Sequence, residues 1–169
     1  MINIAIIDDD KTFCDDFKEQ IEKIDNSYNT DCYYDINTFL ESVSSYNIAV
    51  IDIMLGKDNG IDIASAITEK YPNIKIIFIS VEQDFFQDVY SVNHLYFLVK
   101  PISNEQLKQA LSVCCSEINK QTLYTKLGSG TTAINLNDVS YFEGILKKTI
   151  VHYVNAPKQT LNEPLKDIE

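Results

Sequence analysis

The sequence contains no arginine and no tryptophan, and all 14 basic residues are lysines, against 25 acidic residues. Without arginine, the chain lacks the side chain best suited to bidentate recognition of bases or phosphates. The net charge of −11 also disfavours direct attraction to nucleic acid or to an anionic membrane. Residues 1–120 hold 20 of the acidic and 9 of the basic residues, so the excess negative charge lies in the first part of the chain.

Long hydrophobic runs are also missing. No apolar run approaches the roughly 20 residues that span a bilayer, and the N-terminus lacks the pattern of a secretory signal. We therefore expect a cytoplasmic protein with no membrane partner. The four cysteines, Cys14, Cys32, Cys114 and Cys115, form no CxxC pair and have no metal-ligand spacing, which favours reduced, mostly buried thiols.

The first 120 residues alternate short apolar runs with amphipathic stretches. Phe13, Phe17, Ile21 and Ile24, for example, recur at the spacing of one helix face. Five such strand–helix units predict an α/β domain with a parallel sheet covered on both faces. The expected strands are 2–7, 31–35, 48–52, 74–80 and 95–100, and the expected helices are 11–24, 36–45, 60–71, 82–92 and 103–118, the last capped by Ser103.

The rest of the chain predicts a small, mainly β unit. The segments TLYTKL and TTAINL, separated by GSG, predict a hairpin. VSYFEG and KKTIVHYV are two further candidate strands, and TLNEPLKDIE resembles the start of a helix. We therefore expect two domains, 1–120 and 121–169, the second of which ends abruptly.

Polar residues follow four of the five expected strands of the first domain. Asp8, Asp9 and Asp10 follow the first strand, and Asp52, Ser80 and Lys100 end three others. Open sheets of this kind bind ligands beyond the carboxyl ends of the strands. Carboxylates that converge there need a cation, and oxygen ligands with retained water suit Mg²⁺.

A lysine and a hydroxyl beside such carboxylates predict a phosphoryl site. Lys100 and Mg²⁺ would neutralise developing charge, and Ser80 would hold a phosphoryl oxygen. Asp52, flanked by apolar residues, is the candidate nucleophile for an aspartyl phosphate. Each residue alone would fit a turn, a cap or the surface, and Asp10 is interpreted as a helix cap. The joint arrangement favours the functional interpretation.

At these residues the chain resembles a known family. IAIIDDDK, AVIDIMLGKDNGIDIA, IIFIS and YFLVKPI are similar, in order and spacing, to the receiver domain of bacterial two-component response regulators. The resemblance implies a flavodoxin-like, doubly wound sheet of order 2-1-3-4-5. It implies that Asp52 accepts a phosphoryl group from a sensor histidine kinase. It further implies a Mg²⁺ site formed by Asp8, Asp9, Asp52 and the backbone carbonyl of Met54.

The same resemblance assigns the remaining polar positions. Ser80 matches the switch hydroxyl, and Lys100 matches the phosphate-binding lysine, which a cis bond joins to Pro101 in this family. Phe97 matches the aromatic switch position, although it fits a core position equally well.

The chain also departs from the family pattern. Val81 stands where a small residue is usual, and Gly56 and Lys57 stand where the family commonly has Pro–Gly. Neither change removes a catalytic group.

The second part resembles the first half of a LytTR-type DNA-binding domain, mainly through INLNDVSYFEG and the strand that follows. This implies control of transcription, with DNA bound only through a complete LytTR domain. Lys147 and Lys148 could touch phosphates in such a domain, although a solvated turn is favoured in this neutral segment.

Three functions remain to be compared. The first is a response regulator that forms a homodimer on phosphorylation and is no enzyme apart from Mg²⁺-dependent self-phosphorylation and autodephosphorylation. The alternative is a phosphorylation-independent protein-interaction module without DNA binding, suggested by Val81 and the short tail. A Mg²⁺-dependent phosphatase is disfavoured, because Met54 stands where such enzymes place a second acid. His94 and His152 are isolated, which argues against metal binding or a phosphorelay role.

Overall fold

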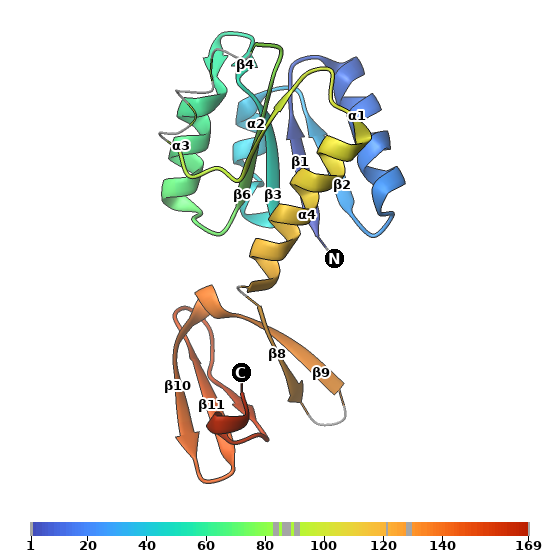
Figure 1. The fold of residues 1–169 in the computed structure, drawn as a ribbon. Helices are drawn as coiled ribbons and strands as arrows, with labels where there is room; N and C mark the ends of the chain where they lie inside the picture. Colours follow the sequence, from blue (N-terminus) through green and yellow to red (C-terminus); the bar gives the residue numbers. More distant parts are fainter. Residues whose placement is uncertain are drawn as a thin grey trace. The chain divides into compact units, whose positions relative to one another are not determined.

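The structure is a computed structural model that describes residues 2–82, 85, 89, 92–120, 122–127 and 130–168. It divides into two compact units, residues 1–115 and 116–169 (Figure 1). The division falls inside helix α4 (Asn104–Lys120). No helix in the described part of the chain combines the length and apolar character needed to cross a bilayer.

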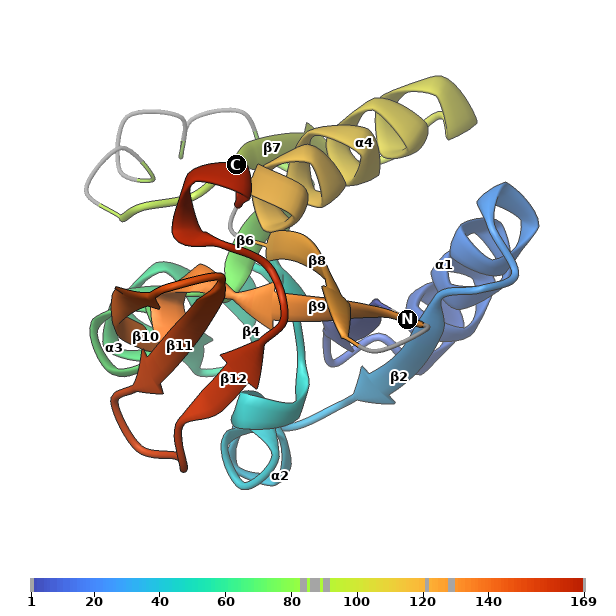
Figure 2. The ribbon, with the colours of Figure 1, turned by 90° about the horizontal axis from the view of Figure 1, so that it is seen from below.

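The first unit is built around a five-stranded parallel sheet of order β2-β1-β3-β6-β7. This order confirms the one that the resemblance implied. The strands are β1 (Asn3–Ile7), β2 (Asn29–Tyr33), β3 (Ile48–Asp52), β6 (Lys75–Ser80) and β7 (Tyr96–Val99). The helices are α1 (Lys11–Ile24), α2 (Ile36–Leu40), α3 (Gly60–Lys70) and α4. Figures 1 and 2 show α1 and α4 on one face of the sheet and α2 and α3 on the other.

The central strands carry the core of this unit. Every residue of β3 and β6 is buried, as are the last four residues of β1. A strand covered by helices on both faces has no solvent side, so its sequence is continuously apolar rather than alternating. The charged and hydroxyl residues that end these runs are therefore placed at the edge of a rigid, buried sheet.

Two helix starts follow from local side-chain chemistry. The Asp10 carboxylate accepts hydrogen bonds from the backbone N–H of Thr12 and Phe13 at the start of α1, which confirms its capping role. Ser103 Oγ accepts from Gln106 N at 3.2 Å, while Gln106 Oε1 accepts from Ser103 N at 3.0 Å. This reciprocal pair is a capping box, and it fixes the start of α4 as predicted.

In the first unit, two elements differ from the sequence-based expectation, and a third expected element lies mostly outside the described residues. The expected helix 36–45 is shorter, because α2 ends at Leu40 and a 3-10 turn (Val43–Ser45) follows. A small antiparallel pair, β4 (Met54–Leu55) and β5 (Asp58–Asn59), was not predicted. The helix expected over 82–92 lies mostly outside the described residues.

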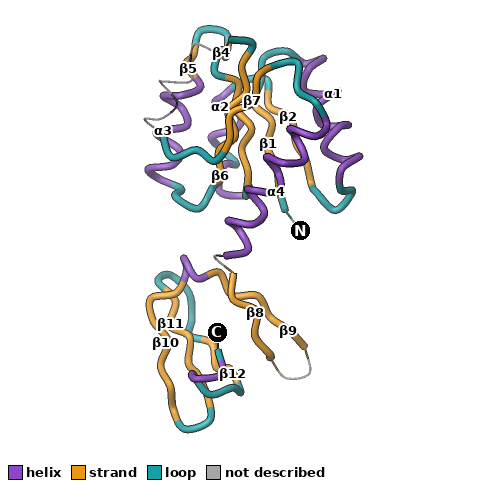
Figure 3. Tube along the Cα trace, in the orientation of Figure 1, coloured by secondary structure: helices purple, strands orange, loops and turns teal. Residues whose placement is uncertain are grey.

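The second unit is strand-rich, as Figure 3 shows. The expected hairpin is confirmed, because β8 (Thr122–Leu127) pairs antiparallel with β9 (Gly130–Asn135). A second antiparallel sheet joins β10 (Val139–Ile145), β11 (Lys148–Tyr153) and β12 (Gln159–Leu161). The two sheets share a small apolar core of Leu123, Ile134, Val151 and Leu161.

The helix start expected over 160–169 is wrong. Thr160 pairs with Ile150 in the sheet, and Leu161 is fully buried. The only helical structure in the described part of this segment is a 3-10 turn (Leu165–Asp167) after Pro164. Proline disfavours the α conformation of the residue before it, which opposes a helix through Glu163.

Candidate functional site

The carboxyl edge of the sheet gathers the polar residues predicted from the sequence. Asp8 follows β1, Asp52 ends β3, Ser80 ends β6 and Lys100 follows β7. These four strands are consecutive in the sheet. Parallel pairing therefore brings residues from four distant parts of the chain to one edge.

Lys100 joins the two acidic strand ends. Its Nζ lies 2.6 Å from Asp8 Oδ2 and 2.6 Å from Asp52 Oδ2. Asp8 is only 1% exposed and Asp52 only 6%, so these contacts are largely shielded from solvent. Charge-assisted hydrogen bonds of this length are stronger than neutral ones. The structure thus brings together Asp8, Asp52 and Lys100 as the sequence predicted.

Two carboxylates share one ammonium in this cluster, which therefore has an excess of negative groups. Burial raises the pKa of Asp8, and the negative charge of Asp52 adds to this effect, against the opposing hydrogen bonds from Lys100 and the Asp10 N–H. Burial alone would lower the pKa of Lys100, but its bonds to Asp52 and Asp8 raise it overall. Two carboxylates around one ammonium therefore favour the approach of a further cation.

The loop after β3 orients the Asp52 carboxylate. Met54 N donates to Asp52 Oδ1 at 3.0 Å, which leaves Oδ2 to Lys100. Gly60 starts α3 against the same strand end, where a Cβ would lie 2.1 Å from the Asp52 carbonyl oxygen. Only glycine allows this close approach.

Asp9 lies on the solvent side of the cluster. It is exposed, unlike Asp8. Its Oδ2 lies 3.7 Å from the position that a Cβ on Gly56 would take, and Gly56 has a left-handed φ of 59°. The Asp9 carboxylate therefore faces the loop that carries Met54.

These residues fit a magnesium ion. Within the described residues, no three His, Cys, Asp or Glu side chains form a metal-ligand group. Mg²⁺ needs no such cage, because it retains several waters and binds through one or two carboxylates. Hard oxygen donors of this kind are supplied by the carboxylates of Asp52 and of the exposed Asp9. The two carboxylates that share one ammonium add a net attraction for a cation.

Ser80 lies at the carboxyl edge of the sheet, at the end of β6, whereas Phe97 lies within β7. Ser80 is fully buried, and its Oγ accepts from Glu82 N at 3.1 Å. Phe97 is partly buried and packs against the main core of the first unit. The bond between Lys100 and Pro101 is cis, as the resemblance implied.

One contact at the site was missed by sequence reasoning. The ring of Phe13 lies under the Lys100 ammonium, with 3.9 Å between Nζ and the ring centroid. In the sequence, the spacing of Phe13 and Phe17 indicated only the buried face of a helix. No pattern in the sequence links a residue in α1 to one after β7.

Other candidate residues have ordinary roles. All four cysteines are free. His94 Nδ1 lies 3.0 Å from the Val92 carbonyl oxygen. His152 Nε2 contacts Glu143 Oε2 at 2.9 Å, and its ring stacks on Tyr141 with a centroid distance of 4.1 Å. Neither histidine belongs to a metal-ligand group in the described residues.

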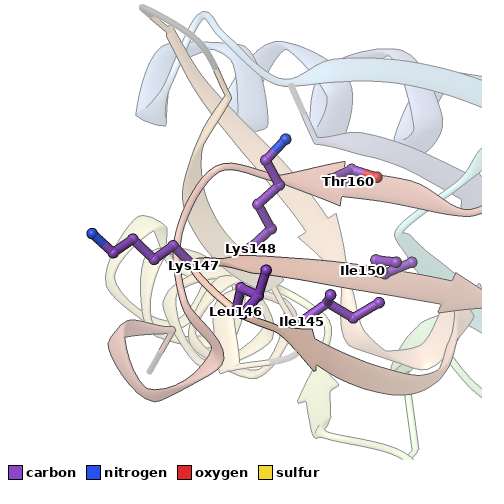
Figure 4. A pocket seen from close by; sticks show the side chains of 6 residues that line it. All are labelled: Ile145, Leu146, Lys147, Lys148, Ile150 and Thr160. Atoms are coloured by element: carbon purple, nitrogen blue, oxygen red, sulfur yellow. The ribbon is translucent and has the colours of Figure 1, made fainter.

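The second unit carries an open, mainly apolar hollow of about 740 Å³ at the β10–β11 turn. Figure 4 shows its lining side chains, Ile145, Leu146, Lys147, Lys148, Ile150 and Thr160. Leu146 is 98% exposed, and both lysines are exposed beside it. The lysines therefore lie at a solvated turn and the following strand start.

The sheet order and the acid–lysine edge define a doubly wound α/β domain with a cluster of charged residues at the carboxyl edge of its sheet. Residues 4–112 match the response regulator receiver domain family. The chain belongs to this family, whose members are the receiver domains of two-component systems.

Comparison with individual proteins agrees with this assignment. The chain is 25% identical over 114 residues to the sensory transduction protein LytT of Bacillus cereus, which covers 66% of this chain and 46% of LytT. The chain thus spans less than half the length of the curated relatives it matches.

Two solved structures share the fold. A CheY-like response regulator receiver protein from Methanospirillum hungatei has a TM-score of 0.62 at 20% identity, covering 71% of this chain and 98% of that one. The response regulator TrrA from Thermotoga maritima, in complex with Mg²⁺–BeF, has a TM-score of 0.60 at 21% identity, covering 68% and 99%.

Proposed function

We propose that the chain is a phosphorylation-dependent switch that accepts a phosphoryl group on Asp52 from a sensor histidine kinase. The observation that carries this proposal is the contact of the Asp52 carboxylate with Lys100 at a buried sheet edge. An Asp52 oxygen would attack phosphorus, and the donor nitrogen would leave with the electron pair of the broken P–N bond. Lys100 would then balance charge on the phosphoryl oxygens.

The residues that would hold Mg²⁺ are Asp8, Asp9, Asp52 and the backbone carbonyl of Met54. When bound, Mg²⁺ supplies positive charge that offsets the repulsion between carboxylates and phosphoryl oxygens. TrrA, a protein of the same fold, has been solved in complex with Mg²⁺–BeF, which supports the proposal that this fold can hold the metal.

The switch itself would involve Ser80 and Phe97. The buried Ser80 hydroxyl would turn to a phosphoryl oxygen, and Phe97 would change its packing against the core. Phosphorylation would then bias a pre-existing equilibrium between two states. A homodimer is the expected phosphorylated form, and autodephosphorylation would end the signal.

For the second unit we propose the first half of a LytTR-type domain, within the domain boundaries 1–120 and 121–169. The similarity to LytT supports a role in transcription control, in the cytoplasm, with DNA bound through a complete LytTR domain. The alternative is a phosphorylation-independent interaction module. Val81, which is 64% exposed beside Ser80, is the observation that favours it.

Labelling with acetyl phosphate and Mg²⁺ tests the proposal. Intact-mass spectrometry should show one added phosphoryl group, sensitive to hydroxylamine, in the native chain and none in Asp52→Asn. Asp62→Asn is a matched control, because Asp62 is an exposed residue in the first turn of α3. Labelling that persists in Asp52→Asn would contradict the proposal that Asp52 accepts the phosphoryl group. A native chain that takes no label with Mg²⁺ would favour the interaction module.

A further inference from the structure

The Lys100 ammonium has an aromatic contact in addition to its two carboxylates. Its Nζ lies 3.9 Å from the centroid of the Phe13 ring. The negative face of an aromatic ring attracts a cation at this distance. With 14% of its side chain exposed, Lys100 is shielded enough for such a contact to count.

The Phe13 ring packs on a core residue, and the Phe13 backbone is held by the helix cap. It stacks on Phe17 with a centroid distance of 5.1 Å and an interplanar angle of 20°. Phe17 is 1% exposed and so is anchored in the core. The backbone N–H of Phe13 donates to the Asp10 cap at 3.1 Å. One face of the ring therefore packs on a core residue, while the cap holds the backbone that carries it.

A fixed contact for Lys100 matters because the proposed reaction changes its other contacts. When an Asp52 oxygen takes up the phosphoryl group and forms an acyl phosphate, negative charge moves outward onto the phosphoryl oxygens, and the ammonium must follow. Lysine carries its charge on a flexible four-carbon stem, which can adopt many rotamers. The Phe13 ring takes no part in the bond changes, so its attraction persists while the carboxylate contacts are exchanged.

The groove beside Lys100 gives a second reason why an aromatic ring at position 13 would matter. Phe13 and Lys100 both line an open groove of about 440 Å³ with Phe17, Val81, Pro101 and Ile102. Without the ring, the ammonium would face more water on this side. Water competes with the phosphoryl oxygens for the lysine protons.

We propose that Phe13 is a positioning residue: its ring holds the Lys100 ammonium at the carboxyl edge of the sheet during phosphoryl transfer to Asp52. This inference rests on the proposed function. It predicts that an aromatic ring, and not merely an apolar side chain, is required at position 13.

Phosphorylation rates with acetyl phosphate at saturating Mg²⁺ provide the first test. Phe13→Leu should react about two- to fivefold more slowly, because an ammonium that the ring no longer holds must be repositioned at the sheet edge before transfer; the factor is the one that a cation–π contact of ordinary strength corresponds to. Phe13→Tyr should keep the native rate. If Phe13→Leu is as fast as the native chain, or Phe13→Tyr is as slow as Phe13→Leu, the positioning role is wrong. Phe13→Met replaces Phe13→Leu if the latter fails to fold.

A spectroscopic readout separates positioning from general packing. In a sample with ¹³C-labelled lysine, the Lys100 ε-methylene signal, assigned by its absence in Lys100→Gln, should be shifted upfield by the ring current. The shift should vanish in Phe13→Leu and remain in Phe13→Tyr. A native signal at the position of the other lysines would overturn the contact. This measurement needs no phosphorylation, so it can fail or succeed independently of the proposed function.

A second aromatic–lysine pair provides a matched control. Lys11 Nζ, at the start of α1, lies 5.2 Å from the centroid of the Tyr34 ring. Tyr34→Leu should leave both the phosphorylation rate and the Lys100 signal unchanged. An equal loss of rate in Tyr34→Leu would show that the effect of Phe13→Leu is not specific to Lys100. Labelling of Asp52→Asn would instead overturn the proposed function.

Discussion

Lys100 and Asp52 lie on opposite sides of β6, yet their Nζ and Oδ2 atoms are 2.6 Å apart. The same ammonium also balances Asp8. We predict that Lys100→Ala destabilises the first unit by about 3–5 kcal/mol, because it leaves two buried carboxylates without a cation. Urea unfolding in Mg²⁺-free buffer measures this change.

Magnesium should partly reverse the loss. Added Mg²⁺ is expected to stabilise Lys100→Ala more than the native chain, since binding to the folded state adds stability. Lys23→Ala, which removes an exposed pair with Glu19, serves as the control and should leave unfolding unchanged. A Lys100→Ala chain as stable as the native one would show that this edge is effectively solvated.

The raised pKa of Asp8 predicts a pH dependence of stability. Burial raises this pKa above the ordinary value of 3.8. The folded state then holds the proton more firmly than the unfolded state. As pH rises from about 3.8 through the raised pKa, the native chain should therefore lose stability relative to Asp8→Asn. Chemical unfolding of both chains across this range, without Mg²⁺, is the measurement.

The direction in which this stability difference changes with pH tests the raised pKa of Asp8. If the native chain gains stability over Asp8→Asn as pH rises, the Lys100 bond outweighs burial and the pKa is lowered instead. Saturating Mg²⁺ should flatten the difference, because the metal favours the ionised carboxylate.

The three consecutive aspartates should separate by function. Asp9→Ala is expected to abolish Mg²⁺ binding, and Asp8→Ala to weaken it, as measured by calorimetric titration. Asp10→Ala should cost about 1 kcal/mol of stability and leave Mg²⁺ affinity intact, since its carboxylate caps α1. Equal loss of affinity in all three variants would contradict this division.

Gly60 should be intolerant of even one added methyl group. A Cβ there would lie 2.1 Å from the Asp52 carbonyl oxygen, so Gly60→Ala must shift either β3 or the start of α3. We expect a loss of stability of about 1–3 kcal/mol together with slower phosphorylation of Asp52. Thermal unfolding and acetyl phosphate labelling measure the two effects. Gly144→Ala, in the second unit, is a control for labelling, which it should leave unchanged.

Much of the fold could be predicted from local patterns. The central strands β3 and β6 are continuous apolar runs bounded by polar residues, and the α1 cap follows from Asp10 alone. The segment after Gln159 was misjudged, because Pro164 and the burial of Leu161 outweigh its helix-like composition. The pair β4–β5 was missed, since two-residue strands leave no periodic signal.

The residue types that end the strands, and with them the acidic edge and its lysine, can be read from the amino-acid sequence. Parallel pairing made this possible, because it places all carboxyl ends on one side. How charge is shared there follows from the packing of the folded chain: Asp8 is buried, Asp9 is exposed, and Lys100 lies between two carboxylates and the Phe13 ring. Burial and close contact depend on elements far apart in the chain, so no local pattern encodes them.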